Sequence, residues 1–102
     1  MDELLTELQK LGKFVKYAWS KAPPDNYGVI AIDGQTALKA SDRQSESIPE
    51  GTIDWFCRNP ASTMPGSIET VLDSAGAAWY LNSVQYESDT GLLHWEWVWQ
   101  YG

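Results

Sequence analysis

The amino-acid sequence predicts an α+β fold in which two helices pack on one face of a four-stranded, mainly antiparallel sheet. Two segments carry apolar residues at helical spacing, and four segments are extended runs rich in β-branched and aromatic residues. These segments follow one another in the order α-β-β-α-β-β. Because the chain has only 102 residues, we expect a single domain, 1–102, with a long polar loop at about 33–50.

The first half of the chain is expected to hold one helix and two strands. The apolar face of the helix consists of Leu4, Leu5, Leu8 and Leu11. Gly12 stands near its end, and the prolines at 23 and 24 exclude a helix from the segment that follows. The β-branched run at 27–32 predicts the first strand, and the segment 51–57 predicts the second. The polar stretch between them lacks a helical stripe and is too long for a tight turn.

The second half predicts a helix and a hairpin. The apolar positions of this helix are Ile68, Val71, Leu72 and Ala75. Ser62, Thr63 or Ser67 is a candidate N-cap, and Gly76 is expected to end the helix in a left-handed conformation. The extended runs 77–87 and 92–101 are joined by "SDTG" and read as two antiparallel strands.

The last strand has one continuously apolar face. Side chains alternate along a strand, so this face consists of Leu93, Trp95, Trp97, Trp99 and Tyr101. Closing the hairpin around "SDTG" predicts the pairs Tyr86 with Leu93, Val84 with Trp95, Asn82 with Trp97, and Tyr80 with Trp99. We expect the two helices to cover this aromatic face. The alternative is that the last tryptophans extend beyond the helices and form a subunit contact.

Charge and composition limit the classes of partner. Fourteen acidic residues against seven Lys and Arg give a net charge of -7, which disfavours binding to duplex nucleic acid. The lysines at one helix end and in the following loop are read as complements of the helix dipole; they are Lys10, Lys13, Lys16 and Lys21.

The sequence also predicts a cytoplasmic site of synthesis. A single cysteine, Cys57, cannot form an intramolecular disulfide. The acidic N-terminus does not resemble a signal or transit peptide, and no stretch approaches the apolar length that spans a membrane. We therefore expect no membrane partner.

Residues with catalytic potential are few. His94 is the only histidine, and we expect it on the polar sheet face with a cross-strand hydrogen bond to Gln85. Cys57 ends an apolar strand pattern and is expected to be buried. The sequence has neither a metal-binding motif nor a nucleotide-binding motif. These patterns predict a protein without catalytic residues, metal or cofactor.

Across nearly its whole length, the chain resembles the tail-completion or tail-terminator proteins of long-tailed bacteriophages and prophages. After the leucine-rich helix, the segments that carry this resemblance are "APPDNYGVIAI", "EGTIDWF", "SIETVLDSAG" and "LNSVQYESDTGLLHWEWVW". The resemblance implies a ring, usually of six subunits, that caps the tail tube and joins it to head-side neck proteins. It also implies that DNA passes through the central channel, and that the protein is made in the host cytoplasm and resides in the virion.

Such a subunit works by contact, so we expect its contacts on the 33–50 loop and on exposed sheet edges. The residues predicted to contact partners are Lys39, Asp42, Arg43, Glu46 and Glu50. Two other classes stay open. A small acidic inhibitor or immunity-type protein would bind a basic partner through the same negative surface. A carbohydrate or ligand-binding module would need Trp95, Trp97 or Trp99 exposed in a concave site.

Overall fold

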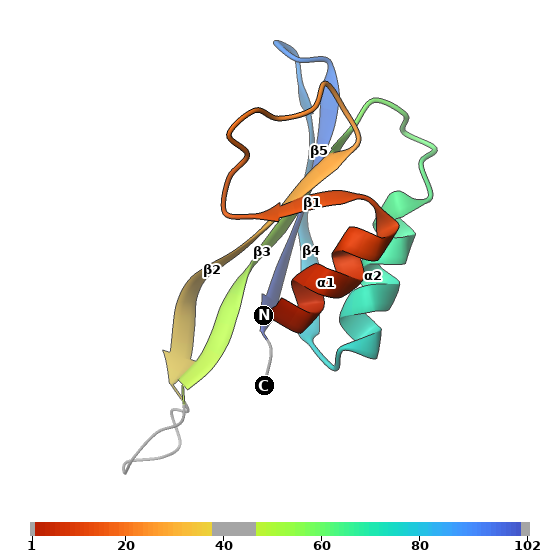
Figure 1. The fold of residues 1–102 in the computed structure, drawn as a ribbon. Helices are drawn as coiled ribbons and strands as arrows, with labels where there is room; N and C mark the ends of the chain where they lie inside the picture. Colours follow the sequence, from red (N-terminus) through yellow and green to blue (C-terminus); the bar gives the residue numbers. More distant parts are fainter. Residues whose placement is uncertain (1, 38–46, 101–102) are drawn as a thin grey trace.

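The structure, a computed structural model, describes residues 2–37 and 47–100. Within these residues the chain forms two helices and five strands (Figure 1). The helices are α1 (Asp2–Leu11) and α2 (Met64–Ser74), and the strands are β1 (Lys13–Lys16), β2 (Tyr27–Ala37), β3 (Ser47–Cys57), β4 (Ala78–Glu87) and β5 (Leu92–Gln100). The strand order in the sheet is β1-β2-β3-β5-β4. The α+β class is confirmed, whereas the expected four strands and their order along the chain are wrong.

The additional strand, β1, begins two residues after α1 and pairs in parallel with β2. Its sequence, "KFVK", is too short and too charged to stand out as a strand. Phe14 is 3% exposed, and its ring stacks on Trp55 with ring centroids 5.3 Å apart. The tertiary packing of one aromatic side chain therefore fixes an element that local pattern does not indicate.

The β2–β3 hairpin extends into the predicted 33–50 loop. The two strands pair antiparallel from Tyr27 opposite Phe56 as far as Ala37 opposite Ser47, with an irregularity between Ile32 and Gly34. The predicted loop is therefore wrong at its two ends, because residues 33–37 belong to β2 and residues 47–50 belong to β3. Antiparallel pairing uses main-chain groups, so polar residues can continue a ribbon that an apolar strand has begun.

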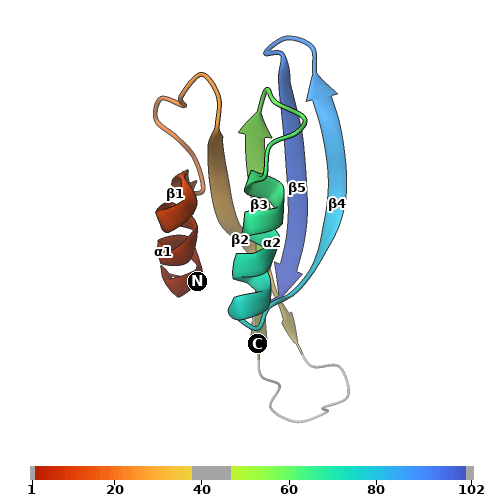
Figure 2. The same ribbon diagram turned by 90° about the vertical axis from the view of Figure 1, so that its right-hand side faces the viewer.

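Both helices lie on the same face of the sheet (Figures 1 and 2). Between the helices and the sheet lies a core of buried hydrophobic residues, which are Leu4, Leu8, Phe14, Ile30, Ile53, Trp55, Cys57, Ile68, Leu72, Trp97 and Trp99. Trp97 and Trp99 are 0% and 1% exposed, so they belong to the interior. Tyr101 lies outside the described residues.

The beginning and end of α2 follow from local chemistry. Thr63 is the N-cap residue, but its side chain makes no capping hydrogen bond. The Ser62 hydroxyl oxygen instead accepts a hydrogen bond from the Met64 N–H at 3.1 Å. Pro65 suits the first turn because its missing N–H has no partner there in any case. After the helix, Gly76 adopts a φ of 76°, a conformation that glycine tolerates without a steric penalty.

The register of the β4–β5 hairpin differs from the predicted one beyond its first pairs. Two predicted pairs are confirmed: Tyr86 with Leu93, and Val84 with Trp95. Further along, the observed pairs are Leu81 with Trp97 and Trp79 with Trp99, and Tyr80 lies opposite Val98. A register shift between Leu81 and Ser83 accounts for the difference, because Asn82 is an extra residue on β4. The bulge brings Trp79 and Leu81 to the helix side and moves Tyr80 to the opposite face.

Candidate interaction surface

Strand β4 forms one edge of the sheet and carries most of the large exposed hydrophobic side chains of the described chain. Tyr80 is 57% exposed, Leu81 40%, Val84 44% and Tyr86 66%. The fifth such residue, Tyr17, lies elsewhere. An edge strand offers unpaired main-chain groups, and an exposed apolar edge is a template for pairing with another chain. We call residues 80–86 of β4 the apolar edge.

The apolar edge is exposed because α2 covers only part of the neighbouring sheet face. Trp79, at the start of β4, donates a hydrogen bond from its indole Nε1 to Asp73 Oδ1 at 2.8 Å, which connects the strand to the helix. Figure 2 shows that β4 then runs past α2 along the outside of the sheet. Leu81, Val84 and Tyr86 therefore share the helix side of the sheet with the core but lie beyond the helical cover.

The bulge within β4 is held by a side-chain contact. Asn82 Nδ2 donates a hydrogen bond to Glu96 Oε1 on β5 at 2.8 Å. Bulges interrupt the ladder locally and increase the twist of an edge strand. The bulge therefore determines which side chains of the apolar edge face the helix side.

The opposite edge of the sheet is basic. The short strand β1 and the loop that follows it carry three exposed lysines, Lys13, Lys16 and Lys21. Tyr17, 56% exposed, stands directly after β1 with a φ of 73°, which is unusual for a residue other than glycine. Its N–H donates to the Ile30 carbonyl at 2.9 Å, so β2 helps to hold this conformation. We call residues 13–21 the basic edge.

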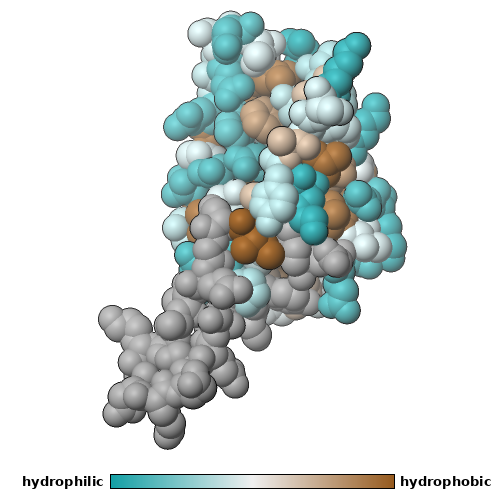
Figure 3. Space-filling view, turned by 60° about the vertical axis from the view of Figure 1, so that its left-hand side comes forward, coloured by the Kyte–Doolittle hydropathy of each residue, from teal (hydrophilic) through white to brown (hydrophobic). Residues whose placement is uncertain are grey.

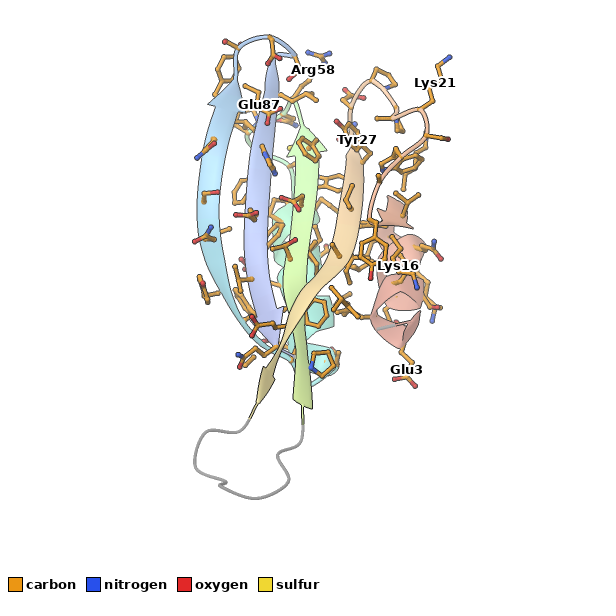
Figure 4. The ribbon with its side chains drawn as sticks, turned by 90° about the vertical axis from the view of Figure 1, so that its left-hand side faces the viewer. Glu3, Lys16, Lys21, Tyr27, Arg58 and Glu87 are labelled. Atoms are coloured by element: carbon orange, nitrogen blue, oxygen red, sulfur yellow. The ribbon has the colours of Figure 1, made fainter. Side chains whose placement is uncertain are left out.

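The face of the sheet opposite the helices is mixed in polarity. Figure 3 looks obliquely at this face, where hydrophilic groups are interspersed with hydrophobic ones. His94 contacts two carboxylates there: its Nε2 lies 2.6 Å from Asp54 Oδ1, and its Nδ1 lies 3.1 Å from Glu87 Oε2. These contacts connect the neighbouring strands β3, β5 and β4. We call this arrangement the His94 clasp; Glu87 is labelled in Figure 4.

The expected hydrogen bond between His94 and Gln85 is not the one that forms. Gln85 does lie opposite His94 in the register, but the ring nitrogens contact Asp54 and Glu87 instead. The sequence indicates a partner for His94 only within the β4–β5 hairpin. Asp54 comes from β3, which pairs with the other side of β5. Only the strand order brings this carboxylate to the histidine.

The clasp favours a protonated histidine. The pKa of His94 is raised from 6.5, first by its hydrogen bond to Asp54, while burial acts in the opposite direction. Both ring nitrogens can donate to carboxylates only when the imidazole carries its second proton. The ring also stacks on Phe56 at 4.2 Å between centroids, and Phe56 stacks on Tyr27 at 4.7 Å. The arrangement connects strands through charge-assisted hydrogen bonds and ring packing.

Cys57 lies in the core and is 0% exposed. Burial raises the pKa of its thiol, which opposes formation of the reactive thiolate. Its Sγ contacts the Asn59 carbonyl oxygen at 3.6 Å. The expected buried position of Cys57 is therefore confirmed.

The cavities of the described chain are open grooves. One groove of about 540 Å³ lies between α1 and α2 and is lined by Leu4, Val71, Glu3 and Glu7 among others. No group of three or more His, Cys, Asp or Glu side chains within residues 2–37 and 47–100 is arranged to hold a metal ion. In the same part of the chain, neither helix has the length and apolar character needed to cross a bilayer.

Four of the five residues predicted to contact partners, Lys39, Asp42, Arg43 and Glu46, lie outside the described residues. The fifth, Glu50, is not on a loop but on β3, opposite Gly34 on one side and Gln100 on the other. Its Oε1 accepts a hydrogen bond from Gln100 Nε2 at 3.2 Å. The prediction placed this residue at the end of a polar stretch that was expected to be a loop, yet it and both of its neighbours are part of the strand.

The apolar edge was not among the residues predicted from sequence. Its signal was present, because β4 alternates polar and apolar residues after the bulge, from Ser83 to Glu87. Sequence reasoning assigned those apolar residues to the core because it could not show where the helical cover ends. Of the tryptophans that a carbohydrate module would expose, Trp97 and Trp99 are buried, and Trp95 is partly buried against the core.

No protein-family model matches this sequence, and a comparison with curated proteins finds no match. Function is therefore inferred from the surfaces of the chain itself.

Proposed function

We propose that this protein is a non-enzymatic structural subunit of a phage or prophage neck. In this role it forms a ring, most simply of six copies, that terminates the tail tube and joins it to the head-side connector. The observation that carries the proposal is the apolar edge, where four large hydrophobic side chains lie exposed on one edge strand. A protein that functions by assembly needs such a surface, whereas a monomeric protein usually keeps its exposed edges short or charged.

The charge of the chain is compatible with this role. Six copies at -7 each would carry six times -7, or roughly -42 formal charges. A channel with acidic walls repels the phosphate backbone and lets DNA pass without adhering. The partners in this proposal are other copies of the chain, the tail tube and the head-side neck proteins, while DNA is only in transit.

Disruption of the gene in the genome that encodes it tests this function. We expect particles from the disrupted genome to accumulate as filled heads and separate tails, visible by electron microscopy, because the joining ring is missing. Supplying the intact gene from a plasmid should restore joined, infectious particles. Normal yields of infectious particles from the disrupted genome would contradict the proposal.

The acidic composition also fits the alternative of a small inhibitor or immunity-type protein. That class predicts a monomer at all concentrations and a salt-sensitive complex with one basic host protein. The apolar edge favours assembly over this alternative, because inhibition by negative charge gives no reason for unpaired hydrophobic residues along β4. Native mass spectrometry over a concentration series separates the two, since only the ring subunit is expected to form closed oligomers.

A further inference from the structure

The two edges of the sheet have opposite charge and matching apolar character. Of the five Lys and Arg residues in the described chain, four lie between positions 10 and 21, at the β1 side. Lys10 forms an ion pair with Glu7 at 2.8 Å. Arg58, the fifth, lies 3.6 Å from Asp25 and donates to the Thr90 carbonyl oxygen. At the β4 side lie two acids next to the apolar edge: Glu87, which also contacts His94, and Asp89. Tyr17, the exposed hydrophobic residue outside β4, stands among the lysines of the basic edge.

We infer that copies of this chain join head to tail, with the apolar edge of one copy docked against the basic edge of the next. This inference rests on the proposed ring function and specifies its subunit contact. Oppositely charged surfaces attract each other and fix the orientation of docking, while apolar side chains give up water on contact. In a contact between two different surfaces, each copy keeps one surface for a further copy. A series of such contacts closes into a ring when the rotation from one copy to the next divides a full turn.

The strand directions allow this contact without turning any copy over. β1 runs parallel to β2, and each following step across the sheet, from β2 to β3, β5 and β4, is antiparallel. A copy placed beside the next in the same orientation therefore brings β4 antiparallel to β1, with the helices of both copies on one face. In Figure 4, Lys21 and Glu87 lie on opposite sides of the molecule but toward the same end of the sheet. Head-to-tail placement brings these two charges toward each other.

Side chains contribute more to this contact than main-chain pairing. β1 has only four residues, whereas β4 has ten. In addition, Gln9 Nε2 of α1 donates to the Phe14 carbonyl oxygen at 3.2 Å, so one main-chain acceptor of β1 is already used. Only a short part of β4 can therefore add to the ladder. The remainder of the contact comes from Val84 and Tyr86 against Tyr17 and the stems of the lysines.

A symmetric contact between two β4 strands is the competing geometry. It would cover the apolar edge, but it would leave the basic edge outside the contact and would use no attraction between opposite charges. It also closes after two copies, because the same surface is used on both sides. Charge complementarity therefore favours the head-to-tail contact.

Two variants that each destroy one surface test the inference. Val84→Lys with Tyr86→Lys changes the apolar edge, and Lys13→Glu with Lys21→Glu changes the basic edge. Under head-to-tail docking, each variant alone should require roughly tenfold or more protein to assemble. An equimolar mixture should give one-to-one heterodimers and nothing larger, because only one intact pair of surfaces remains. Native mass spectrometry separates the species by mass.

The basic-edge variant needs a control of equal charge. Each Lys→Glu change alters the net charge by two units, so Asn59→Asp, Ala61→Glu, Thr70→Glu and Ser74→Glu together give the same total change away from both edges. This control should assemble as the parent protein does. Circular dichroism and thermal unfolding confirm that each variant is folded. If the double-lysine variant of β4 is unfolded, Val84→Ser with Tyr86→Ser replaces it.

The outcomes distinguish a failure of the head-to-tail contact from a failure of the proposed ring function. A parent protein that is monomeric at every concentration contradicts the ring itself. If the parent protein forms a ring and the basic-edge variant assembles equally well, only the head-to-tail contact is overturned. Self-association of the basic-edge variant into dimers, with no heterodimer in the mixture, assigns the apolar edge to the symmetric β4 contact instead.

Discussion

At the scale of single residues, His94 contributes the most specific polar contacts of the sheet. It joins Asp54 on one neighbouring strand to Glu87 on the other through its two ring nitrogens. Charge-assisted hydrogen bonds are stronger than neutral ones, and both depend here on one proton. The stability of the sheet is therefore coupled to the protonation of this side chain.

We expect the free energy of unfolding to fall as pH rises above 6.5 and through the folded-state pKa of His94. That pKa is raised from 6.5, so the folded protein binds the proton more tightly than the unfolded chain does. The stabilisation is complete below 6.5 and is lost at higher pH. Urea unfolding across this range should show that His94→Gln costs about 1 to 2 kcal/mol in acid and much less in alkali.

Gln85→Ala is the control for this prediction, because Gln85 lies opposite His94 in the register without bonding to its ring nitrogens. It should leave the pH dependence of unfolding unchanged. A His94→Gln protein with the same pH dependence as the parent would rule out the clasp as its source.

Among the described glycines, a Cβ at Gly51 would come closest to the main chain of a neighbouring strand. A Cβ built at this position would overlap the Ala31 carbonyl oxygen and lie 2.9 Å from the Trp99 ring. We expect Gly51→Ala to lower the free energy of unfolding by about 1 to 3 kcal/mol, because backbone and a buried ring must both move. Gly66→Ala is the matched change, since nothing lies within 4 Å of its Cβ position in α2. It should raise stability by about 0.5 to 1 kcal/mol. Equal effects on thermal unfolding would contradict this difference.

At the scale of elements, the β4–β5 hairpin shows how one residue sets the composition of a surface. The bulge at Asn82 keeps Trp79 and Leu81 on the helix side although regular alternation would place Tyr80 there. Because Asn82 is the extra residue, its removal leaves every other pair of the hairpin in place. Deleting a residue from β5 has a different consequence, because β5 pairs with β3 on one side and with β4 on the other.

We expect deletion of Asn82 to leave a folded protein with unfolding free energy within about 1 kcal/mol of the parent, since only an exposed hydrogen bond is lost. Deletion of Glu96, across the bulge, should prevent folding. It turns Trp97 and Trp99 toward the opposite face, and no single shift of β3 or β4 restores both ladders. Tryptophan fluorescence and circular dichroism distinguish these results. Comparable losses in the two deletions would refute this account of the register.

At the scale of the whole molecule, charge is distributed unevenly although the total is -7. The described lysines gather at the β1 side, and the end of β4 is acidic. A total charge alone would predict that copies repel one another. Because the positive and negative side chains lie at opposite edges, the basic edge of one copy can attract the acidic end of β4 in the next. This attraction acts in one orientation only, although the acidic chains repel one another overall.

Salt should therefore affect the assembly of copies much more than the folding of one subunit. Added sodium chloride screens the ion pairs between exposed edges, so we expect the head-to-tail contact to weaken severalfold between about 0.05 and 0.5 M salt. Unfolding of the separated subunit should change little, because its core is apolar. Sedimentation velocity measures the first effect and thermal unfolding the second. Assembly that strengthens steadily with salt would indicate a contact without attractive charges.

The sequence by itself determined both helices, the main strands and the aromatic side of the last strand, because these depend on periodicity within one segment. The buried positions of Cys57 and Trp97 follow from the same local alternation. Tertiary structure alone decided the strand order, the short strand β1 and the Asp54 contact of His94, since each depends on which distant segments lie side by side. It also decided that β4 is an exposed edge. Alternation shows which residues share a face, but only the position of α2 shows where that face ceases to be covered.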